Sequence, residues 1–311
     1  MEFFKKTTHI NFLGQRKPAA IISAILIIGS LVALGVKGLN FGIDFTGGTL
    51  VELGYSEPME PQTVRDVLAG TPFADAQVQA YGSVQDILIR VAPRADKSSA
   101  EVSNQVIQTL RSAGQDVELR RVEFVGPQVG EELTQDGGLA MLYALFGILI
   151  YVGLRFETRL AVGSVAALMH DVIVTLGFFA VTQMNFDLSV LAAILAVIGY
   201  SLNDTIVVFD RVRENFRALR ERPPLEIFNI SLNQTLSRTI MTGVTTLMVL
   251  LALFIFGGET LLGFSTALIL GVLVGTYSSI YVASAVSLVL GISKQDLMPV
   301  QKEGAELDDQ P

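Results

Sequence analysis

Asp204 is the one acidic residue inside the long apolar run Leu188–Phe209. A carboxylate in such a run costs about 2.5 to 3.5 kcal/mol on lenient membrane-insertion scales, so by default it marks a functional position. On a helix, Tyr200, Ser201 and Asp204 share one face, because residues three and four apart lie above each other. Asn203 borders that face. Two interpretations stay open: Asp204 hydrogen-bonds a neighbouring helix and holds a bundle together, or it lies on an ion or proton pathway.

Arg238 opens a later apolar segment, and Thr235, Thr242 and Thr245 continue its polar stripe at helical spacing. Both charges fall toward the same end of their segments, so Asp204 and Arg238 can approach each other. Burial raises the pKa of a carboxyl group, whereas a nearby guanidinium lowers it. A carboxylate whose distance from its partner differs between two states therefore changes its proton affinity, as proton-coupled motion requires. The alternative is a permanent ion pair that fixes the helix register.

Asp171 follows His170 in the middle of another apolar segment. It too has two interpretations, a structural hydrogen bond or a position on the proton pathway. His170 by itself is interpreted as a packed or interface residue. Gly271, Gly275 and Ser279 stand four apart in a further segment, a register that lets two helices pack closely.

Gly47 and Gly48 lie outside the apolar segments and allow positive φ angles at a tight entry into a first strand. Asp44, just before them, is expected to cap that turn rather than to bind an ion. No pair of nucleophile and base is visible, so the sequence predicts no enzyme.

The composition agrees with a membrane protein that carries one water-soluble part. Half of the residues are hydrophobic and only 17% are charged. The absence of cysteine excludes disulfides and thiolate metal sites, and two histidines leave little for zinc. The sequence has no phosphate-binding loop of the G-x-x-x-x-G-K-[ST] type, so nucleotide-driven work is not expected. We expect no metal and no cofactor, and any energy must come from a partner or from the membrane.

Residues 1–18 are polar and basic and lead into the apolar run 19–36, about as long as a bilayer span requires. The small-x-small sequence Ala33-Leu34-Gly35 also fits the cleavage site of a signal peptide. Because further apolar segments follow, we interpret this run as an uncleaved first transmembrane helix.

Residues 37–136 alternate strand and helix patterns. The expected elements are Thr49–Leu53 (strand), Gln62–Ala69 (helix), Ala76–Tyr81 and Ile87–Ala92 (strands), Ser98–Ala113 (helix) and Val117–Val125 (strand). Ser98 or Ser99 is the expected N-cap of the second helix, and Gly114 its end. This order is that of a ferredoxin-like α+β domain, placed between the first and second transmembrane helices.

Five more spans are expected within residues 137–290, which gives a polytopic α-helical protein with six transmembrane helices. They are Gly138–Leu154, Leu160–Thr182, Leu188–Phe209, Ile240–Phe256 and Leu261–Leu290, the last long enough to be bent or to protrude from the bilayer. In the intervening loop 210–239, Arg213–Arg222 is expected to continue the fourth span. Leu225–Thr235 is expected to form a separate short helix along the membrane face.

Basic residues gather in residues 1–18, in the short loop Arg155–Arg159, in the loop 210–239 and in the tail 291–311. The short loops on the opposite side, Gln183–Asp187 and Gly257–Thr260, carry none. The positive-inside rule then makes both termini cytoplasmic and puts 37–136 on the outer, periplasmic side. We interpret the basic loop as a membrane anchor, not a nucleic-acid site, because interleaved aromatic residues are absent.

Four motifs resemble the SecF branch of the SecD/SecF family, within the resistance-nodulation-division superfamily. They are FGIDFTGG at Phe41–Gly48, GYSLNDTIVVFDRVREN at Gly199–Asn215, QTLSRTIMTGVTT at Gln234–Thr246 and YSSIYVA at Tyr277–Ala283. The second motif is highly specific, whereas the first is shared with SecD-like sequences. The resemblance covers essentially the whole chain.

The resemblance implies a subunit of the bacterial inner membrane that works with SecD beside the SecYEG translocon, with YajC and YidC as further partners. Its six helices would form half of a pseudosymmetric bundle that SecD completes. The implied role is use of the proton-motive force to promote late-stage preprotein translocation. The family's intramembrane acid then falls on Asp204, its basic partner on Arg238, and Asn203 belongs to the same motif.

Two other functions stay in competition. The chain could be a structural subunit that stabilises SecD and the translocon without conducting protons. It could also be half of a small-molecule exporter, although its single small outer domain weighs against that function.

Overall fold

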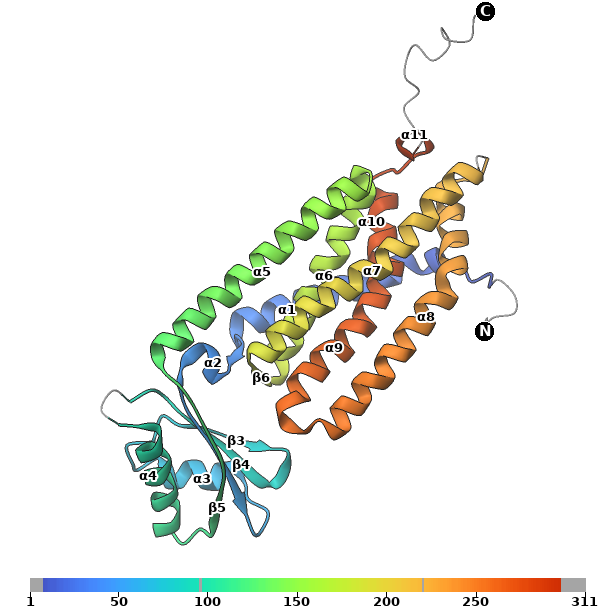
Figure 1. Cartoon of the computed structure of the whole chain (residues 1–311). Helices are drawn as coiled ribbons and strands as arrows, with labels where there is room; N and C mark the ends of the chain where they lie inside the picture. Colours follow the sequence, from blue (N-terminus) through green and yellow to red (C-terminus); the bar gives the residue numbers. More distant parts are fainter. Residues whose placement is uncertain (1–7, 95–96, 220, 298–311) are drawn as a thin grey trace, which may run out of the picture.

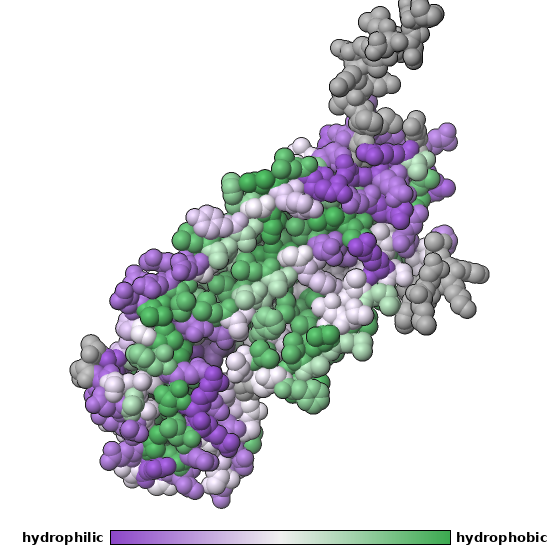
Figure 2. Space-filling model, in the orientation of Figure 1, coloured by the Kyte–Doolittle hydropathy of each residue, from purple (hydrophilic) through white to green (hydrophobic). Residues whose placement is uncertain are grey.

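The computed structural model describes residues 8–94, 97–219 and 221–297. Six helices in this part of the chain are long and apolar enough to cross a membrane. They stand side by side in one bundle, with a small domain of strands and helices at one end (Figure 1). On the face that Figure 2 shows, a hydrophobic band lies along the middle of the bundle and hydrophilic surface lies at both ends. The chain is therefore a multi-pass α-helical membrane protein, as its sequence predicts.

The first crossing consists of the 3₁₀-helix η1 (Phe12–Gln15) and α1 (Arg16–Val36). The next four are α5 (Pro127–Arg155), α6 (Thr158–Thr182), α7 (Leu188–Ala218) and α8 (Pro224–Phe256). The sixth is built from α9 (Gly258–Ser278), the π-helix η2 (Ser279–Ala283) and α10 (Ser284–Val289), and α11 (Lys294–Leu297) follows it. The π-helix η2 lies within the expected span Leu261–Leu290, whose length allows a bend.

Helix α5 begins well before the span predicted at Gly138–Leu154, so the expected domain boundary at residue 136 falls inside a helix. Hydropathy detects only the apolar turns of α5. Its first turns are polar and are supported by Pro127 at N1 and by a hydrogen bond between Gln128 and Glu132.

The expected separate helix at Leu225–Thr235 is wrong, because α8 runs without interruption from Pro224 into the membrane. No glycine or proline follows in its first turns to end it. The Asn215 side chain of α7 donates to Ser231 and Gln234 at 2.8 Å each, which holds this part of α8 upright against α7. Pro223 is the N-cap of α8, and Pro224 is its first residue.

The sheet domain, residues 48–125, has the predicted order of strands and helices. Its elements are β2 (Gly48–Tyr55), α3 (Pro61–Leu68), β3 (Gln77–Tyr81), β4 (Ser83–Val91), α4 (Ser99–Ser112) and β5 (Val117–Val125). The strands pair antiparallel in the order β3-β4-β2-β5. The apolar side chains of one sheet face pack with those of α3 and α4. Ser98 forms a capping box with Glu101, and Gly114 follows α4 at φ 82°.

Three short elements connect the sheet domain to the bundle. Strand β1 (Asn40–Phe41) follows α1 and pairs in parallel with β6 (Asn185–Phe186), which lies between α6 and α7. Helix α2 (Ile43–Thr46) then leads into β2. These elements therefore tie the end of α1 to the start of α7 directly beside the sheet domain.

Candidate functional site

Asp204 lies in the core of the bundle on α7, where its side chain is 7% exposed. Its Oδ1 accepts a hydrogen bond from the Thr239 hydroxyl of α8 at 2.7 Å. Its Oδ2 accepts one from the Ser279 hydroxyl, at the start of η2, at 2.6 Å. A hydrogen bond to a charged group contributes about 1.5 to 3 kcal/mol. An ionised Asp204 therefore holds three membrane segments together through two neutral donors.

Arg238, the expected basic partner of Asp204, forms no ion pair with it in the described part of the chain. The Arg238 side chain is exposed on α8, although its charge still acts on the carboxylate. Thr239 points inward instead, because adjacent residues on a helix point about 100° apart. Thr242 and Thr245 donate to carbonyl oxygens of their own helix. The α8 residue that contacts Asp204 is therefore Thr239, which directly follows the expected partner Arg238.

Asn203 also points to the surface of the bundle rather than toward Asp204. The same face of α7 exposes Ala192, Ala196 and Gly199, and we call these four residues the α7 strip. An exposed amide on a narrow strip of small residues suits close packing of another helix better than contact with lipid.

Asp171 and His170 lie side by side on α6, and each is 1% exposed. The His170 Nδ1 is 2.9 Å from Asp171 Oδ1. Asp171 Oδ2 accepts from the Ser201 hydroxyl of α7 at 2.5 Å and from the Ser278 hydroxyl of α9 at 2.7 Å. Ser201 lies one turn before Asp204, and Ser278 immediately precedes the other donor to that acid. The two buried carboxylates are therefore bound by adjacent residues of the sixth span, and the second donor to Asp171 lies on the helix that carries Asp204.

Gly271 and Gly275 bring α9 against α7. A Cβ at Gly271 would lie 2.1 Å from a methyl carbon of Val197, and one at Gly275 would lie 3.1 Å from the Cβ of Ser201. Ser279, which was expected to serve helix packing, donates to Asp204 instead. The close approach of the two helices puts its hydroxyl within reach of that carboxylate.

Arg90 of β4 joins the sheet domain to the bundle. Its Nη1 donates to the Phe41 carbonyl oxygen at 2.5 Å, and its Nη2 donates to Asn185 Oδ1 at 2.7 Å. The guanidinium thus reaches both strands of the β1-β6 pair. Burial lowers the pKa of Arg90, while the charges of Asp187 and Asp44 act in the opposite direction.

Asp44 was expected to cap its own turn before Gly47, but it caps the start of α7. Its Oδ2 accepts from the backbone N–H of Leu188, the first residue of α7, at 3.0 Å. The first N–H groups of a helix lack intrahelical partners and carry partial positive charge, which favours a carboxylate there. Gly47 and Gly48 follow at φ 66° and 119°. A Cβ at Gly48 would lie 2.4 Å from a carbonyl oxygen of β4, so this turn requires glycine.

An open cleft of about 480 Å³ separates the rest of the sheet domain from the bundle. Across it, Arg121 of β5 donates to the Thr260 hydroxyl of α9 at 3.3 Å. The cleft is lined by Asp44 and Arg90 among others. Polar contacts next to an open cleft form a joint whose geometry can change more readily than that of an apolar interface.

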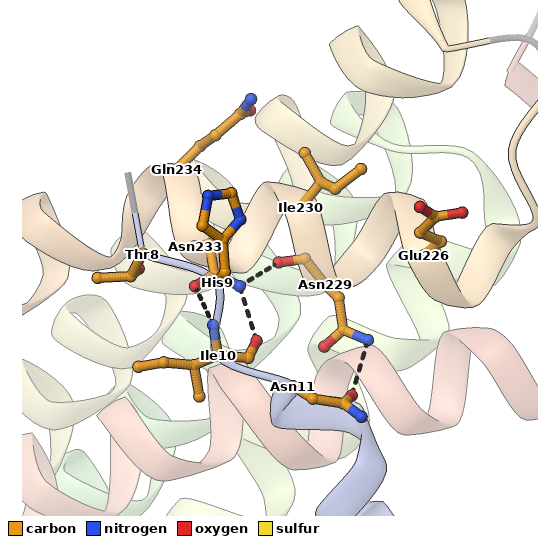
Figure 3. Close-up of a pocket in the computed structure, with 9 residues that line it drawn as sticks. All are labelled: Thr8, His9, Ile10, Asn11, Glu226, Asn229, Ile230, Asn233 and Gln234. Carbon is orange, nitrogen blue, oxygen red and sulfur yellow. Dashed lines mark hydrogen bonds between the residues drawn. The ribbon is translucent and has the colours of Figure 1, made fainter. Parts of the chain in front are cut away.

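At the far end of the bundle, the segment before η1 docks on the first turns of α8 (Figure 3). The Asn233 side chain bonds both the N–H and the carbonyl oxygen of Ile10, at 2.8 Å each. Asn229 accepts from the Leu13 N–H at 3.0 Å. His9 lines the adjoining pocket of about 270 Å³. These contacts fix the beginning of the helix that carries Thr239.

Sequence reasoning found both acids but missed the donors Thr239 and Ser278. A hydroxyl residue stands out neither by hydropathy nor by charge. The available signal is the density of serine and threonine in the two segments that follow α7, because a buried carboxylate requires donors from its neighbours.

Two family models match the chain. Residues 105–293 match "Protein export membrane protein SecD/SecF, C-terminal", and residues 32–59 match the SecD/SecF GG motif. The protein translocase subunit SecF of Vibrio alginolyticus is 52% identical over 100% of this chain and 99% of that relative. The SecF of Pseudomonas aeruginosa is 50% identical over 97% of this chain and 98% of that relative.

Solved structures show the same architecture. The crystal structure of SecDF, a translocon-associated membrane protein from Thermus thermophilus, matches 93% of this chain with a TM-score of 0.83 and 36% identity. This chain spans only 39% of that SecDF chain. A SecDF structure in a super-membrane-facing form also matches 93% of this chain, with a TM-score of 0.69.

The two donor hydroxyls of α8 allow a matched test of the site. We expect Thr239→Val to lower the unfolding temperature of the detergent-solubilised chain, because one oxygen of a buried carboxylate loses its donor, at about 1 to 3 kcal/mol. Thr245→Val should have a much smaller effect, because that exposed hydroxyl donates to carbonyl oxygens of its own helix. Thermal unfolding followed by circular dichroism compares them, and equal shifts would contradict the assignment of Thr239.

Proposed function

The chain belongs to the SecD/SecF family of protein export membrane proteins, and from this membership we propose that it uses the proton-motive force to promote late-stage preprotein translocation. It would do so as the SecF-type accessory subunit of the Sec translocon. The observation that carries the proposal is the buried Asp204, bound on both oxygens by hydroxyls of neighbouring segments. The membrane potential supplies about 2.3 kcal/mol per charge for each 100 mV.

Proton binding would change the contacts of Asp204. An ionised carboxylate accepts from both the Thr239 and the Ser279 hydroxyls, whereas a protonated carboxyl carries one O–H donor of its own. One hydroxyl must then turn from donor to acceptor or lose its bond. Protonation therefore alters the packing of α7 against α8 or η2, which is the local step that a proton-driven motion requires.

A route from Asp204 to the sheet domain runs along α7. The first residue of this helix is capped by Asp44, and Arg90 fastens the adjoining β1-β6 pair to β4. A displacement of α7 would therefore act on the sheet domain through polar contacts beside an open cleft. The two SecDF structures match this chain with unequal TM-scores, which supports more than one arrangement in those relatives.

We propose that the end of the bundle away from the sheet domain faces the cytoplasm. Arginines concentrate there, at the α5–α6 turn and on the last turns of α7, in the pattern of the positive-inside rule. Both termini then lie in the cytoplasm, and the sheet domain lies in the periplasm, facing outward from the bacterial inner membrane. Membrane lipid would surround the apolar band.

We propose SecD as the partner that covers the α7 strip and the exposed Arg238 of α8. A guanidinium and an amide on apolar spans are costly in contact with lipid, and a second helical bundle would shield both. The SecYEG translocon, YajC, YidC and the translocating preprotein are the further partners of this proposal. We propose no nucleic-acid partner, no cofactor and no enzymatic reaction for this chain.

A structural role is the second candidate function, and the same hydrogen bonds favour it. A carboxylate that only holds a bundle together would also need two donors from neighbouring segments. In that role the subunit would stabilise SecD and the translocon without conducting protons. The two functions predict different effects on translocation and on the level of the complex when the negative charge of Asp204 is removed.

Preprotein translocation in inverted membrane vesicles separates the two. After ATP is removed, we expect Asp204→Asn to abolish the step driven by a proton gradient while the complex keeps its normal level on immunoblots. Asp136→Asn, the same change at an exposed site on α5, should retain that step. Unchanged translocation by Asp204→Asn would refute proton use at this residue, and loss of the complex itself would favour the structural role.

The proposed SecD interface predicts selective cross-linking. The chain contains no cysteine, so one introduced cysteine gives one labelling site. We expect a benzophenone attached to Asn203→Cys to cross-link to SecD in membranes. The same probe on Leu142→Cys, which is 63% exposed on α5, should not. Equal cross-linking from both positions would contradict an interface at the α7 strip.

A further inference from the structure

His170 has one ring nitrogen that the described structure leaves without a partner. Its Nδ1 faces Asp171 at 2.9 Å, whereas its Nε2 is fully buried and forms no hydrogen bond. The whole side chain is 1% exposed. With Asp171 ionised, the carboxylate can only accept, so Nδ1 carries the hydrogen of this bond and Nε2 keeps a free lone pair. A buried basic atom without a partner is a position that a proton can fill.

Three consecutive residues connect His170 to its surroundings. The Tyr277 hydroxyl donates to the Ala19 carbonyl oxygen of α1 at 2.7 Å, and its ring lies 6.0 Å from the His170 ring. Ser278 donates to Asp171 on α6, and Ser279 donates to Asp204 on α7. Successive side chains of a helix point in different directions, so this one segment reaches three others. It ends at a π-helix, a distortion that is frequent at functional sites.

We propose that His170 and Asp171 form a second proton-binding site, which accepts its proton at His170 Nε2 and communicates with Asp204 through Ser201, Ser278 and Ser279. This inference rests on the proposed function of Asp204 as a proton site. The ligand is a proton, and no other group is transferred. An O–H bond breaks at the donor carboxyl and an N–H bond forms at Nε2, so the charge of the His170–Asp171 pair changes from −1 to 0.

The serine residues make the two sites interdependent. The sixth span donates to both carboxylates, through Ser278 to Asp171 and through Ser279 to Asp204. The other donor to Asp171 is Ser201, on the helix that carries Asp204. A change of charge at one carboxylate therefore acts on the other through adjacent residues, within one turn of α7. Because Asp204 and the His170–Asp171 pair lie close together in the bundle, a proton can leave one of them while the other binds a proton.

Few other titratable groups lie around His170. Asp171 is its neighbour on α6, Asp204 lies on α7, Tyr277 faces it from α9, and Tyr281 of η2 packs on the Tyr277 ring. The part of α1 that packs against α6 contributes none, because residues 19–36 contain no ionisable side chain. A titration seen at His170 can therefore be assigned with a small set of variants.

The chain has only two histidines, His9 and His170, which makes the site directly observable. The full chain with His9→Gln, labelled with ¹⁵N-histidine and placed in lipid nanodiscs, gives the nitrogen signals of His170 alone. We expect Nε2 to be without a proton at the high-pH end of a titration series and to carry one at the low-pH end. Asp204→Asn in the same background should displace the midpoint of this transition. A single protonation state across the range would overturn the proposal, and an unmoved midpoint would overturn the link to Asp204.

Translocation gives an independent test. Asparagine at position 170 can still donate a hydrogen bond toward Asp171 but cannot bind a proton. We expect His170→Asn to assemble normally and to slow the gradient-driven step about tenfold or more. His9→Gln, which alters only the pocket before η1, should behave as wild type. Normal translocation by His170→Asn together with loss in Asp204→Asn would overturn this inference alone, whereas normal translocation by both would overturn the proposed function as well.

Discussion

The hydrogen bonds of Asp204 are the constraint on which the rest of the membrane structure depends. A buried carboxylate must find donors in the protein, and here the donors come from α8 and from the junction of α9 with η2. Ser279 reaches the acid because Gly271 and Gly275 let α9 lie directly on α7. The positions of three membrane segments are thus set around one charge. A change in that charge cannot leave their packing unaltered.

The same helix that carries Asp204 also begins at the joint with the sheet domain. Asp44 caps its first residue, and Arg90 links the adjoining strand pair to β4. The tight glycine turn after α2 keeps this joint short. Because α7 is a rigid element between two polar sites, a packing change at one site reaches the other without passing through a flexible loop. This arrangement gives the proposed proton-driven motion a physical path.

Much of this fold could be predicted from the sequence, because apolar length, strand periodicity, caps and basic loops are local signals. The six spans and the order of strands and helices in the sheet domain follow from them. Hydropathy predicts only the apolar part of α5, because its first turns are polar. It divides α8, because the polar first turns of that helix resemble a surface helix. Asp204 stood out by its charge, whereas Thr239 and Ser278 are identified only by contacts between segments far apart in the chain. Asp44 was assigned to its own turn for the same reason: its partner, Leu188, is a tertiary neighbour.

If Asp204 takes up and releases a proton, proton movement across a membrane depends on its carboxyl group. The chain would be reconstituted with SecD in liposomes that contain a pH-sensitive dye, and an inward proton gradient would be imposed with the membrane potential clamped. For this role of Asp204 we expect proton entry through the wild-type complex, equal entry with Asp136→Asn, and entry reduced to that of empty liposomes with Asp204→Asn. Proton entry through Asp204→Asn at the wild-type rate would contradict it.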